Sequence, residues 1–370
     1  IFVNNSAEYS GGGLYNYSSS PIFSTCIFSE NFSGQGAGVY NRSSAPAFQN
    51  CKFKGNNAAN AGGAIFNYRS NPCIINSMFQ DNSSINGGAL SANESSYITF
   101  TNCTFWANGA ENEGGAIYSE YSSELTSTNC TFSGNSASSG GAVFNDYGCN
   151  SIFTNCILWN NHANNDGDEI LDHSYPGSVV TYSVTQGGWP GEGNLRFDPM
   201  FLNPGSGDFH LLPISPCIDS GSSGAVEHPE DFEGDARVQG HAVDMGIDET
   251  PYTAPVVITG TASAITESSA TLNGMVASLA SAASGTVSFI YGDKSGGPYP
   301  CESVPLVING TGPFSLDVTG LIDGHNIYYR AKLKAGGIAY GKERQSTAMN
   351  LPNTWYVNAD AASNGKGSSW

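Results

Sequence analysis

The sequence has little charge, and positive charge is scarcest of all. Only 12% of its 370 residues are Asp, Glu, Lys or Arg, and 13 Lys and Arg face 32 Asp and Glu, a formal net charge of −19. Phosphate backbones and anionic membrane surfaces are held by clustered Lys and Arg, so this balance argues against both as partners. No apolar run approaches the ~20 residues of a membrane-spanning helix. We therefore predict no nucleic-acid partner and no direct membrane insertion.

Two kinds of cysteine motif are also missing. The nine cysteines include no CxxC pair and no Cys/His cluster, which argues against a structural zinc site. The chain begins without Met or a signal-peptide pattern, and we interpret it as a segment or processed product of a larger protein. Five of the nine cysteines recur at a fixed interval, so they belong to a repeat.

What the sequence does contain is a period of about 26 residues. An apolar residue follows a glycine-rich pair at intervals of 25 to 27 residues, at Leu14, Val39, Ile65, Leu90, Ile117, Val143 and Ile170. A second motif starts with a cysteine at Cys26, Cys51, Cys103, Cys130 and Cys156, and with serine at Ser77. Two residues later come Phe28, Phe53, Phe79, Phe105 and Phe132. Three residues further on come Asn31, Asn56, Asn82, Asn108, Asn135 and Asn161.

This repeat predicts stacked coils of short parallel strands. Helical solenoids have longer repeats, and the apolar pieces here are only three to five residues long between Gly, Asn and Ser. Each strand would pair with its copy one coil away, roughly 4.8 Å along the axis. Cys and Phe two residues apart face the same side, so we expect both to point inward as ladders. We expect the asparagines to form an amide ladder at a left-handed bend, and the glycine pair to form a tight corner.

The repeated "GGAI" and "FxxN" resemble the paired repeats of the chlamydial polymorphic outer-membrane proteins. More broadly, residues 1–175 are similar to right-handed parallel β-helix surface proteins. The resemblance implies an all-β fold: a right-handed parallel β-helix of about 26 residues per coil, which brings no catalytic motif with it.

The residues after 175 do not follow the 26-residue period. We predict that 176–250 form the last coils and a C-terminal cap, followed by a linker at 251–255. Residues 256–349 alternate as in a β-sandwich and resemble a fibronectin type III-like domain. Ile327 stands where such domains place a corner tyrosine, unless Tyr328 substitutes. Residues 350–370 look like the start of a following β-helix module.

Several side chains are candidates for a chemical site, although we predict no catalytic residue. Two carboxylates are needed for glycoside hydrolysis, and the best candidates are Glu111, Glu113, Glu120 and Glu124. A weak metal site is conceivable at Asp166, Asp168 and Glu169. No cofactor is predicted, but calcium is left open at the cap acids Asp198, Asp219, Asp231, Asp235 and Asp244. A ligand-binding surface is considered at Tyr15, Tyr40, Tyr118, Trp106 and Trp159, although we favour the alternative that the aromatic column stacks on itself and stiffens the sheet.

The favoured function is a structural or adhesive module of an extracellular cell-surface protein. The solenoid, the appended sandwich, the low charge and the many Ser, Thr and Asn residues motivate it. Its expected partners are neighbouring copies or modules of the same protein, joined end to end as a filament, with surface glycans as a second class. The alternative is a polysaccharide-binding or polysaccharide-degrading β-helix protein.

Overall fold

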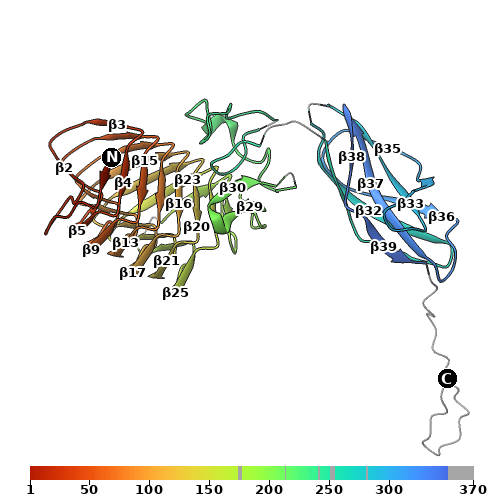
Figure 1. The fold of residues 1–370 in the computed structure, drawn as a ribbon, viewed down its shortest axis with the longest axis horizontal. Coiled ribbons are helices and arrows are strands. Elements are labelled where there is room, and N and C mark those ends of the chain that lie inside the picture. The colour runs from red at the N-terminus through yellow and green to blue at the C-terminus, as the bar shows by residue number, and fades with distance from the viewer. Residues whose placement is uncertain (174–176, 213, 241, 251–254, 281, 349–370) are drawn as a thin grey trace, which may run out of the picture. The chain divides into compact units, whose positions relative to one another are not determined.

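The structure, a computed structural model, contains two compact units (Figure 1). It describes every residue except 174–176, 213, 241, 251–254, 281 and 349–370. Unit 1 spans Ile1–Tyr252 and unit 2 spans Thr253–Trp370. The predicted start of a further β-helix module at 350–370, and most of the predicted linker at 251–255, lie outside the described residues.

Four parallel sheets, called A to D here, form the solenoid of unit 1 (Figure 1). Sheet A contains β1 (Phe2–Val3), β4 (Ile27–Ser29), β8 (Lys52–Lys54), β12 (Met78–Gln80), β16 (Thr104–Trp106), β20 (Thr131–Ser133), β24 (Ile157–Trp159) and β28 (Val184–Thr185). Sheet B contains β5 (Phe32–Gln35), β9 (Asn57–Ala61), β13 (Ser83–Asn86), β17 (Gly109–Glu113), β21 (Ser136–Ser139) and β25 (His162–Asp166). Sheet C contains β2 (Leu14–Tyr17), β6 (Val39–Arg42), β10 (Ile65–Tyr68), β14 (Leu90–Asn93), β18 (Ile117–Ser119), β22 (Val143–Asn145) and β26 (Ile170–Asp172). Sheet D contains β3 (Ile22–Ser24), β7 (Ala47–Gln49), β11 (Cys73–Ile75), β15 (Tyr97–Thr101), β19 (Glu124–Thr128), β23 (Asn150–Thr154) and β27 (Val179–Thr181).

One coil of the chain passes through the four sheets in turn and then enters the next coil. Each strand pairs in parallel with its copy one coil later, so that Phe28 lies beside Phe53 and Val39 beside Ile65. The sequence period therefore corresponds to one coil, because identical positions must stack for the strands to stay in register. The predicted all-β parallel β-helix is confirmed.

Aromatic rings stacked along the axis fill much of the interior. The Phe53 and Phe79 rings of sheet A lie 4.7 Å apart with an interplanar angle of 4°. Rings from sheet D meet them edge-on, as where Phe100 and Phe105 lie 5.1 Å apart at 85°. Such aromatic pairs contribute about 0.5–1.5 kcal/mol each beyond their buried area, so the ladder stiffens the solenoid as well as filling it.

The turns between sheets A and B correct one prediction. The left-handed residue is the one before each ladder asparagine, for example Asp81 with φ +54° before Asn82, and the ladder asparagines themselves have no positive φ. Asparagine does adopt this conformation at the corner between sheets D and A, as at Asn102 with φ +52°. The preceding residue makes the bend because the ladder amide must point inward to bond its copies.

The glycine pair is required at the corner between sheets B and C. Gly62 has φ +64°, a conformation that L side chains rarely adopt. A Cβ on Gly63 would lie 2.1 Å from the carbonyl oxygen of Gly88 in the next coil. The first glycine therefore permits the turn, and the second permits the close approach of neighbouring coils.

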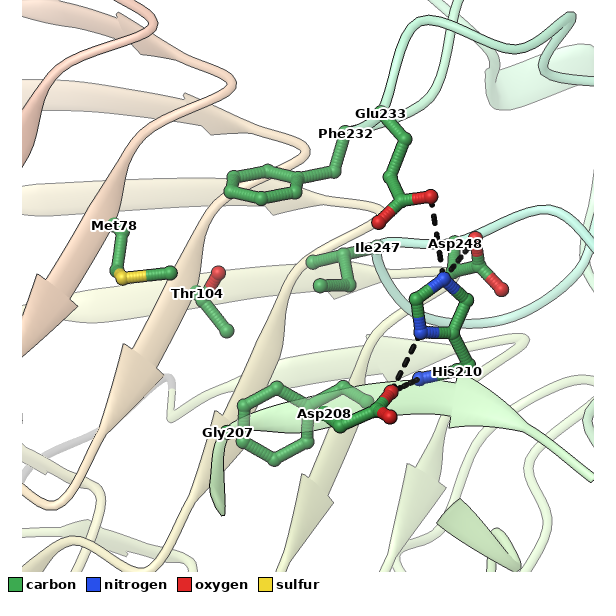
Figure 2. Close-up of a pocket in the computed structure, with 10 residues that line it drawn as sticks. Met78, Thr104, Gly207, Asp208, His210, Phe232, Glu233, Ile247 and Asp248 are labelled. Carbon is green, nitrogen blue, oxygen red and sulfur yellow. Dashed lines mark hydrogen bonds and ion pairs between the residues drawn. The ribbon is translucent and has the colours of Figure 1, made fainter. Parts of the chain in front are cut away.

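The cap extends over one side of the solenoid as well as its last coil. After β28 the chain forms a hairpin of β29 (Phe201–Asn203) and β30 (Asp208–Leu211), joined by the 3-10 turn η1 (Pro204–Ser206), and later a second turn, η2 (Ser223–Ala225). Phe232 and Ile247 of the cap line one pocket with Met78 and Thr104 of sheet A (Figure 2). The cap thus covers part of the outer face of sheet A.

Unit 2 is an antiparallel sandwich. Its first sheet contains β31 (Val256–Thr259), β32 (Ser269–Ser278) and β36 (Gly312–Thr319). Its second contains β33 (Gly285–Gly292), β34 (Cys301–Glu302), β35 (Leu306–Ile308), β37 (Asn326–Ala335), β38 (Gly337–Tyr340) and β39 (Arg344–Thr347). Neither Ile327 nor Tyr328 supplies a corner hydroxyl; the buried Tyr329 does, by accepting a 2.8 Å hydrogen bond from Ala262 N. No helix among the described residues is long and apolar enough to cross a membrane.

Candidate functional site

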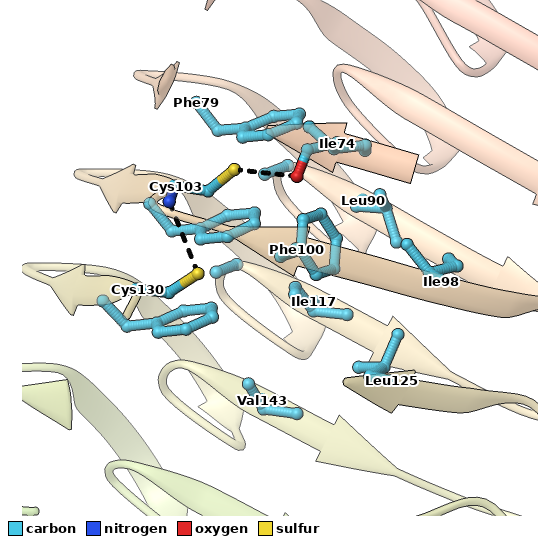
Figure 3. Close-up of a cluster of buried hydrophobic side chains, with 14 of the residues drawn as sticks. Ile74, Phe79, Leu90, Ile98, Phe100, Cys103, Ile117, Leu125, Cys130 and Val143 are labelled. Carbon is cyan, nitrogen blue, oxygen red and sulfur yellow. Dashed lines mark hydrogen bonds between the residues drawn. The ribbon is translucent and has the colours of Figure 1, made fainter. Parts of the chain in front are cut away.

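The cysteine positions form an interior column (Figure 3). The backbone N–H of Cys103 donates to Sγ of Cys130, and that of Cys130 donates to Sγ of Cys156, each at 3.4 Å. Ser77 takes the same place, because its Oγ accepts from the N–H of Cys51 at 3.0 Å. Burial raises the pKa of the Cys130 and Cys156 thiols, and all nine cysteines are free. These thiols serve packing, since thiolates are the reactive and metal-binding form.

The asparagines form a second interior column next to the phenylalanines. Oδ1 of Asn108 accepts from both the backbone N–H and the Nδ2 of Asn82, at 3.1 and 2.9 Å. Nδ2 of Asn108 in turn donates to Asn135 Oδ1 and to the Phe79 carbonyl oxygen. The same pattern joins Asn31, Asn56, Asn82, Asn108, Asn135 and Asn161.

The three predicted metal ligands near 168 do not come together. Asp166 and Asp168 are exposed, while Glu169 is buried and accepts from Asn161 Nδ2 at the end of the asparagine column. Burial raises the pKa of Glu169 to about 8. The reason is positional: Glu169 stands where earlier coils have an inward-facing Ala, so its carboxyl terminates the ladder.

Two of the five residues considered as an aromatic ligand surface are buried. Tyr40 and Tyr118 are only 8% and 6% exposed. Trp106 packs edge-on against Phe209 of the cap, and Trp159 is half-buried. Of the five side chains, only that of Tyr15 is exposed, at 46%. Strand alternation predicted the outward direction of Trp106, but covering by the cap is a long-range event with no local sequence signal.

A different surface forms beside Tyr15 on the outer face of sheet C. The guanidinium carbon of Arg42 lies 5.7 Å from the ring centroids of both Tyr17 and Tyr68. Arg69 also lies over the Tyr68 ring, with its guanidinium carbon 5.2 Å from the centroid. We call Tyr15, Tyr17, Arg42, Tyr68 and Arg69 the tyrosine–arginine strip. It combines exposed ring faces with two of the four cations in residues 1–175. The sequence signal was present, because the coil period places Tyr17, Arg42 and Tyr68 side by side.

The predicted glycosidase carboxylates separate into two groups. The charges of Glu113 and Glu120 both help to raise the pKa of the buried Tyr118. The Tyr118 hydroxyl donates a hydrogen bond to Glu120 Oε2 at 3.2 Å. Burial raises the pKa of both carboxyls, and the nearby Asp146 raises them further. Glu111 and Glu124 are exposed on sheets B and D instead.

The cap contains a cluster that sequence reasoning missed. Three carboxylates surround His210 of β30. Its Nδ1 is 2.5 Å from Asp208 Oδ1, and its Nε2 is 3.2 Å from Glu233 Oε2 (Figure 2). Asp248 Oδ1 lies 4.0 Å from the same Nε2. The hydrogen bond with Asp208 is the main reason that the pKa of His210 rises to about 9. Neither period nor local spacing relates these residues, so no sequence signal pointed to them.

The cap acids considered for calcium accept backbone N–H groups. Asp231 Oδ1 accepts from the N–H groups of residues 233, 234 and 235, each at 2.9 Å. The oxygens of Asp244 accept from Asp219 N and Thr250 N. Asp198 accepts from Met200 N in the same way, and Asp235 is exposed. Their role is to order irregular turns that no strand ladder supports.

A buried arginine organises the cap around these turns. Arg237 donates to the carbonyl oxygens of Ile247 and Asp244, at 2.8 and 3.0 Å, and to that of Gly246. Asp244 and Glu249 lie nearby, and burial raises their pKa values to about 6 and about 8. The guanidinium therefore fixes the backbone at 244–247, directly before Asp248.

Residues 14–179 match the family model described as "Right handed beta helix region". This part of the chain is a parallel β-helix. The β-helix begins before and continues after the matched residues, because β1 and β28 extend sheet A on either side. No curated protein matches the chain.

Solved structures that resemble the chain include the sensor domain of the anti-sigma factor RsgI4 of Pseudobacteroides cellulosolvens. Its short form is 14% identical with a TM-score of 0.24, covering 27% of this chain and 98% of that one. The long form is 13% identical with a TM-score of 0.23, covering 28% and 98%. A solution structure is 13% identical with a TM-score of 0.24, covering 31% and 92%. Scores this low support no statement about function.

Proposed function

We propose that this protein is a structural and adhesive module of an extracellular cell-surface protein, and that its tyrosine–arginine strip binds acidic surface glycans. The single observation that carries the adhesive part is the strip itself. Tyrosine faces pack against the apolar faces of sugar rings, and a guanidinium can pair with a uronate carboxylate in a bidentate manner.

Charge supports an acidic ligand on this face. The chain carries a net charge of −19, yet Arg42 of sheet C and Arg69, directly after β10 of the same sheet, both lie over the ring of Tyr68. Two tyrosine rings restrict the Arg42 guanidinium and one restricts that of Arg69, so less side-chain freedom is lost when a ligand binds. Arg69 also pairs with Glu94 at 3.1 Å, which leaves Arg42 as the cation without an acidic partner among the described residues.

The interior supports the structural part of the proposal. Cysteine, phenylalanine and asparagine columns run along the solenoid, and each member bonds or stacks on its copies. Interactions of this kind hold neighbouring coils at one spacing, so the outer face keeps a fixed geometry. The proposal includes unit 2 as a fibronectin type III-like domain, supported by its two antiparallel sheets over a shared core.

A panel of neutral and uronate-containing polysaccharides tests the glycan proposal. We expect the full chain to bind uronate-containing members, with affinity that falls as salt rises. Arg42→Ala should weaken binding about tenfold or more, as expected for a charged hydrogen bond. Lys54→Ala, on the outer face of sheet A, is the matched control and should bind normally. Equal binding by both variants, or no binding by the parent, would refute the proposal.

End-to-end assembly is the second part of the proposal. The sheets end in edge strands, and β1, β2 and β3 form one set of these edges. Open parallel edges are templates for further strands. Electron microscopy of the native material tests this: filaments with a repeat along the solenoid axis are expected, and dispersed monomers alone would contradict it.

Glycan cleavage is a second candidate function, favoured by Glu113 and Glu120. Both carboxyls have raised pKa values and both lie at Tyr118, as a proton donor with a neighbouring carboxylate would. Release of reducing ends from acidic polysaccharides is the measurement. Loss of turnover in Glu120→Gln, with turnover retained in Glu111→Gln, would favour an enzyme over an adhesive module.

A further inference from the structure

We propose that His210, Glu233 and Asp248 form a binding site in the cap for a first-row divalent metal ion such as Zn²⁺. The three side chains reach one point from separate segments: β30, the turn after Asp231, and the stretch held by Arg237. Figure 2 shows the imidazole directed toward both carboxylates. This site is independent of the tyrosine–arginine strip.

The donor atoms are close enough to share one ion. One ligand atom from each residue lies within 4.8 Å of the other two. Zinc bonds to nitrogen and oxygen are about 2.0–2.2 Å, which separates neighbouring tetrahedral ligands by about 3.4 Å. The distances from His210 Nε2 to Glu233 Oε2 and Asp248 Oδ1 are 3.2 and 4.0 Å, on either side of that value. Small side-chain rotations would therefore complete the geometry.

Asp208 orients the imidazole for this role. Its Oδ1 is 2.5 Å from His210 Nδ1 and also accepts the backbone N–H of His210 at 3.2 Å. A carboxylate on Nδ1 holds the proton there, so that a metal ion can take the place of the proton on Nε2, the arrangement found behind many histidine ligands. Asp208 is thus a positioning residue, and the ligands are His210 Nε2 and the two carboxylates that face it.

Asp248 provides the independent sign that something is missing. Its side chain is only 10% exposed, yet its carboxylate accepts no hydrogen bond from any described residue. Buried carboxylates are normally paired or hydrogen-bonded, because taking the charge out of water is costly. Among the described residues, the one basic group within 4.0 Å of this carboxylate is the imidazole, which lies beyond hydrogen-bonding distance. A cation between them would supply the missing partner.

The donor set identifies the class of ion. One imidazole nitrogen and two carboxylate oxygens suit zinc and neighbouring transition metals, whereas calcium takes oxygen ligands alone. Three protein ligands leave a position for water or a further ligand. Binding would fasten the β30 hairpin to two cap loops that sheet hydrogen bonds do not join, so we expect it to stabilise the cap.

Calorimetric titration of the chelator-treated full chain with Zn²⁺ tests the proposal. One ion per chain should bind, and thermal unfolding should shift to higher temperature with Zn²⁺ and return with chelator. His210→Ala should abolish both effects. His162→Ala is the matched control, because His162 also lies near a carboxylate, 3.8 Å from Asp168, but lacks a third ligand. The control should bind Zn²⁺ as the parent does.

Two further variants keep the test decisive if His210→Ala is poorly folded. Glu233→Gln changes a half-exposed side chain, and we expect at least tenfold weaker binding with an unchanged circular dichroism spectrum. Asp208→Asn should weaken binding about 10–100-fold, as second-layer partners of metal ligands do. No Zn²⁺ binding by the parent, or unchanged binding by folded His210→Ala and Glu233→Gln, would overturn the proposal.

Discussion

Single side chains inside the solenoid are coupled to their copies in both directions. Asn108 is bonded to Asn82, Asn135 and the Phe79 carbonyl, all in surroundings without water. Removing one amide therefore leaves several buried donors and acceptors without partners. Each such group costs about 1–3 kcal/mol, so the effect of one substitution extends over three coils.

Asn108→Ala should lower the free energy of unfolding by about 3 kcal/mol or more, because Asn82 and Asn135 both lose a buried partner. Asn60→Ala is the control, since Asn60 is exposed on β9 and its change should stay within about 0.5 kcal/mol. Urea unfolding of the two variants measures the difference. Equal midpoints would show that the ladder bonds contribute little.

Glu169 makes stability depend on pH. Burial raises its pKa from the model-peptide value of 4.5 to about 8, so the folded chain holds a proton that the unfolded chain releases. Its contribution is present below pH 4.5 and is lost as the pH rises toward 8. Glu169→Gln keeps an acceptor for Asn161, so it should match the parent at pH 5 and exceed it in thermal stability at pH 8.5.

Glu111→Gln is the control for this titration, because Glu111 is exposed and its loss should change stability equally little at both pH values. The comparison is between each variant and the parent at the same pH, since buried acids of the cap also titrate. Parallel pH profiles for Glu169→Gln and the parent would contradict the assignment.

At the scale of elements, the corners determine how closely the coils approach. The strands are short and pair with their copies over two to five residues. The corners must therefore bring each strand back beside its copy in the neighbouring coil. Gly62 turns the chain, and Gly63 lies directly against the next coil. A corner that pushed the coils apart would disturb all four sheets, because they share one axial spacing.

Gly63→Ala should therefore destabilise unit 1 by about 3 kcal/mol, in the range of overpacked sites, because its Cβ meets the backbone of Gly88 and Ser83. Gly109→Ala is the control: the nearest atom to its Cβ would be Ser136 Oγ at 3.8 Å, an ordinary contact. Chemical unfolding followed by circular dichroism distinguishes them, and equal loss in both would mean that the corner is not the cause.

At the scale of the whole molecule, two cores are stabilised by different means. Unit 1 repeats one set of contacts along an axis, whereas unit 2 closes two antiparallel sheets over a single core. Each unit has its own buried cluster, so we expect each to unfold in its own transition.

Tyr329→Phe tests that independence. It removes a buried hydroxyl that accepts from Ala262 N at 2.8 Å and donates to the Gly260 carbonyl at 3.2 Å, so about 1–2 kcal/mol should be lost in unit 2. Calorimetry should show one transition at lower temperature and the other unchanged. Tyr340→Phe, at a half-exposed ring, should alter neither. Lowering of both transitions by Tyr329→Phe would show that the units unfold together.

The sequence alone determined the solenoid, because a stacked coil must repeat its inward positions. Cys103, Phe105 and Asn108 could each be assigned to a column from spacing, before any coordinate was known. The same spacing places Tyr17, Arg42 and Tyr68 side by side, although the strip was overlooked in favour of the neighbouring aromatic column. In a periodic sequence, contacts between residues about 26 positions apart can be predicted from their spacing alone.

Only the tertiary structure decided what happens where the period stops. His210, Glu233 and Asp248 meet because the irregular cap folds back over sheet A. The cap also covers Trp106, which packs against Phe209. Tyr40, by contrast, stacks on its own copies, with ring centroids 5.0 Å from Tyr15 and 5.2 Å from Phe66. In the repeat, each strand must align with its copy, so the spacing of residues in the sequence fixes which of them meet. The cap loops do not repeat, so their contacts depend on three-dimensional packing and cannot be predicted from spacing.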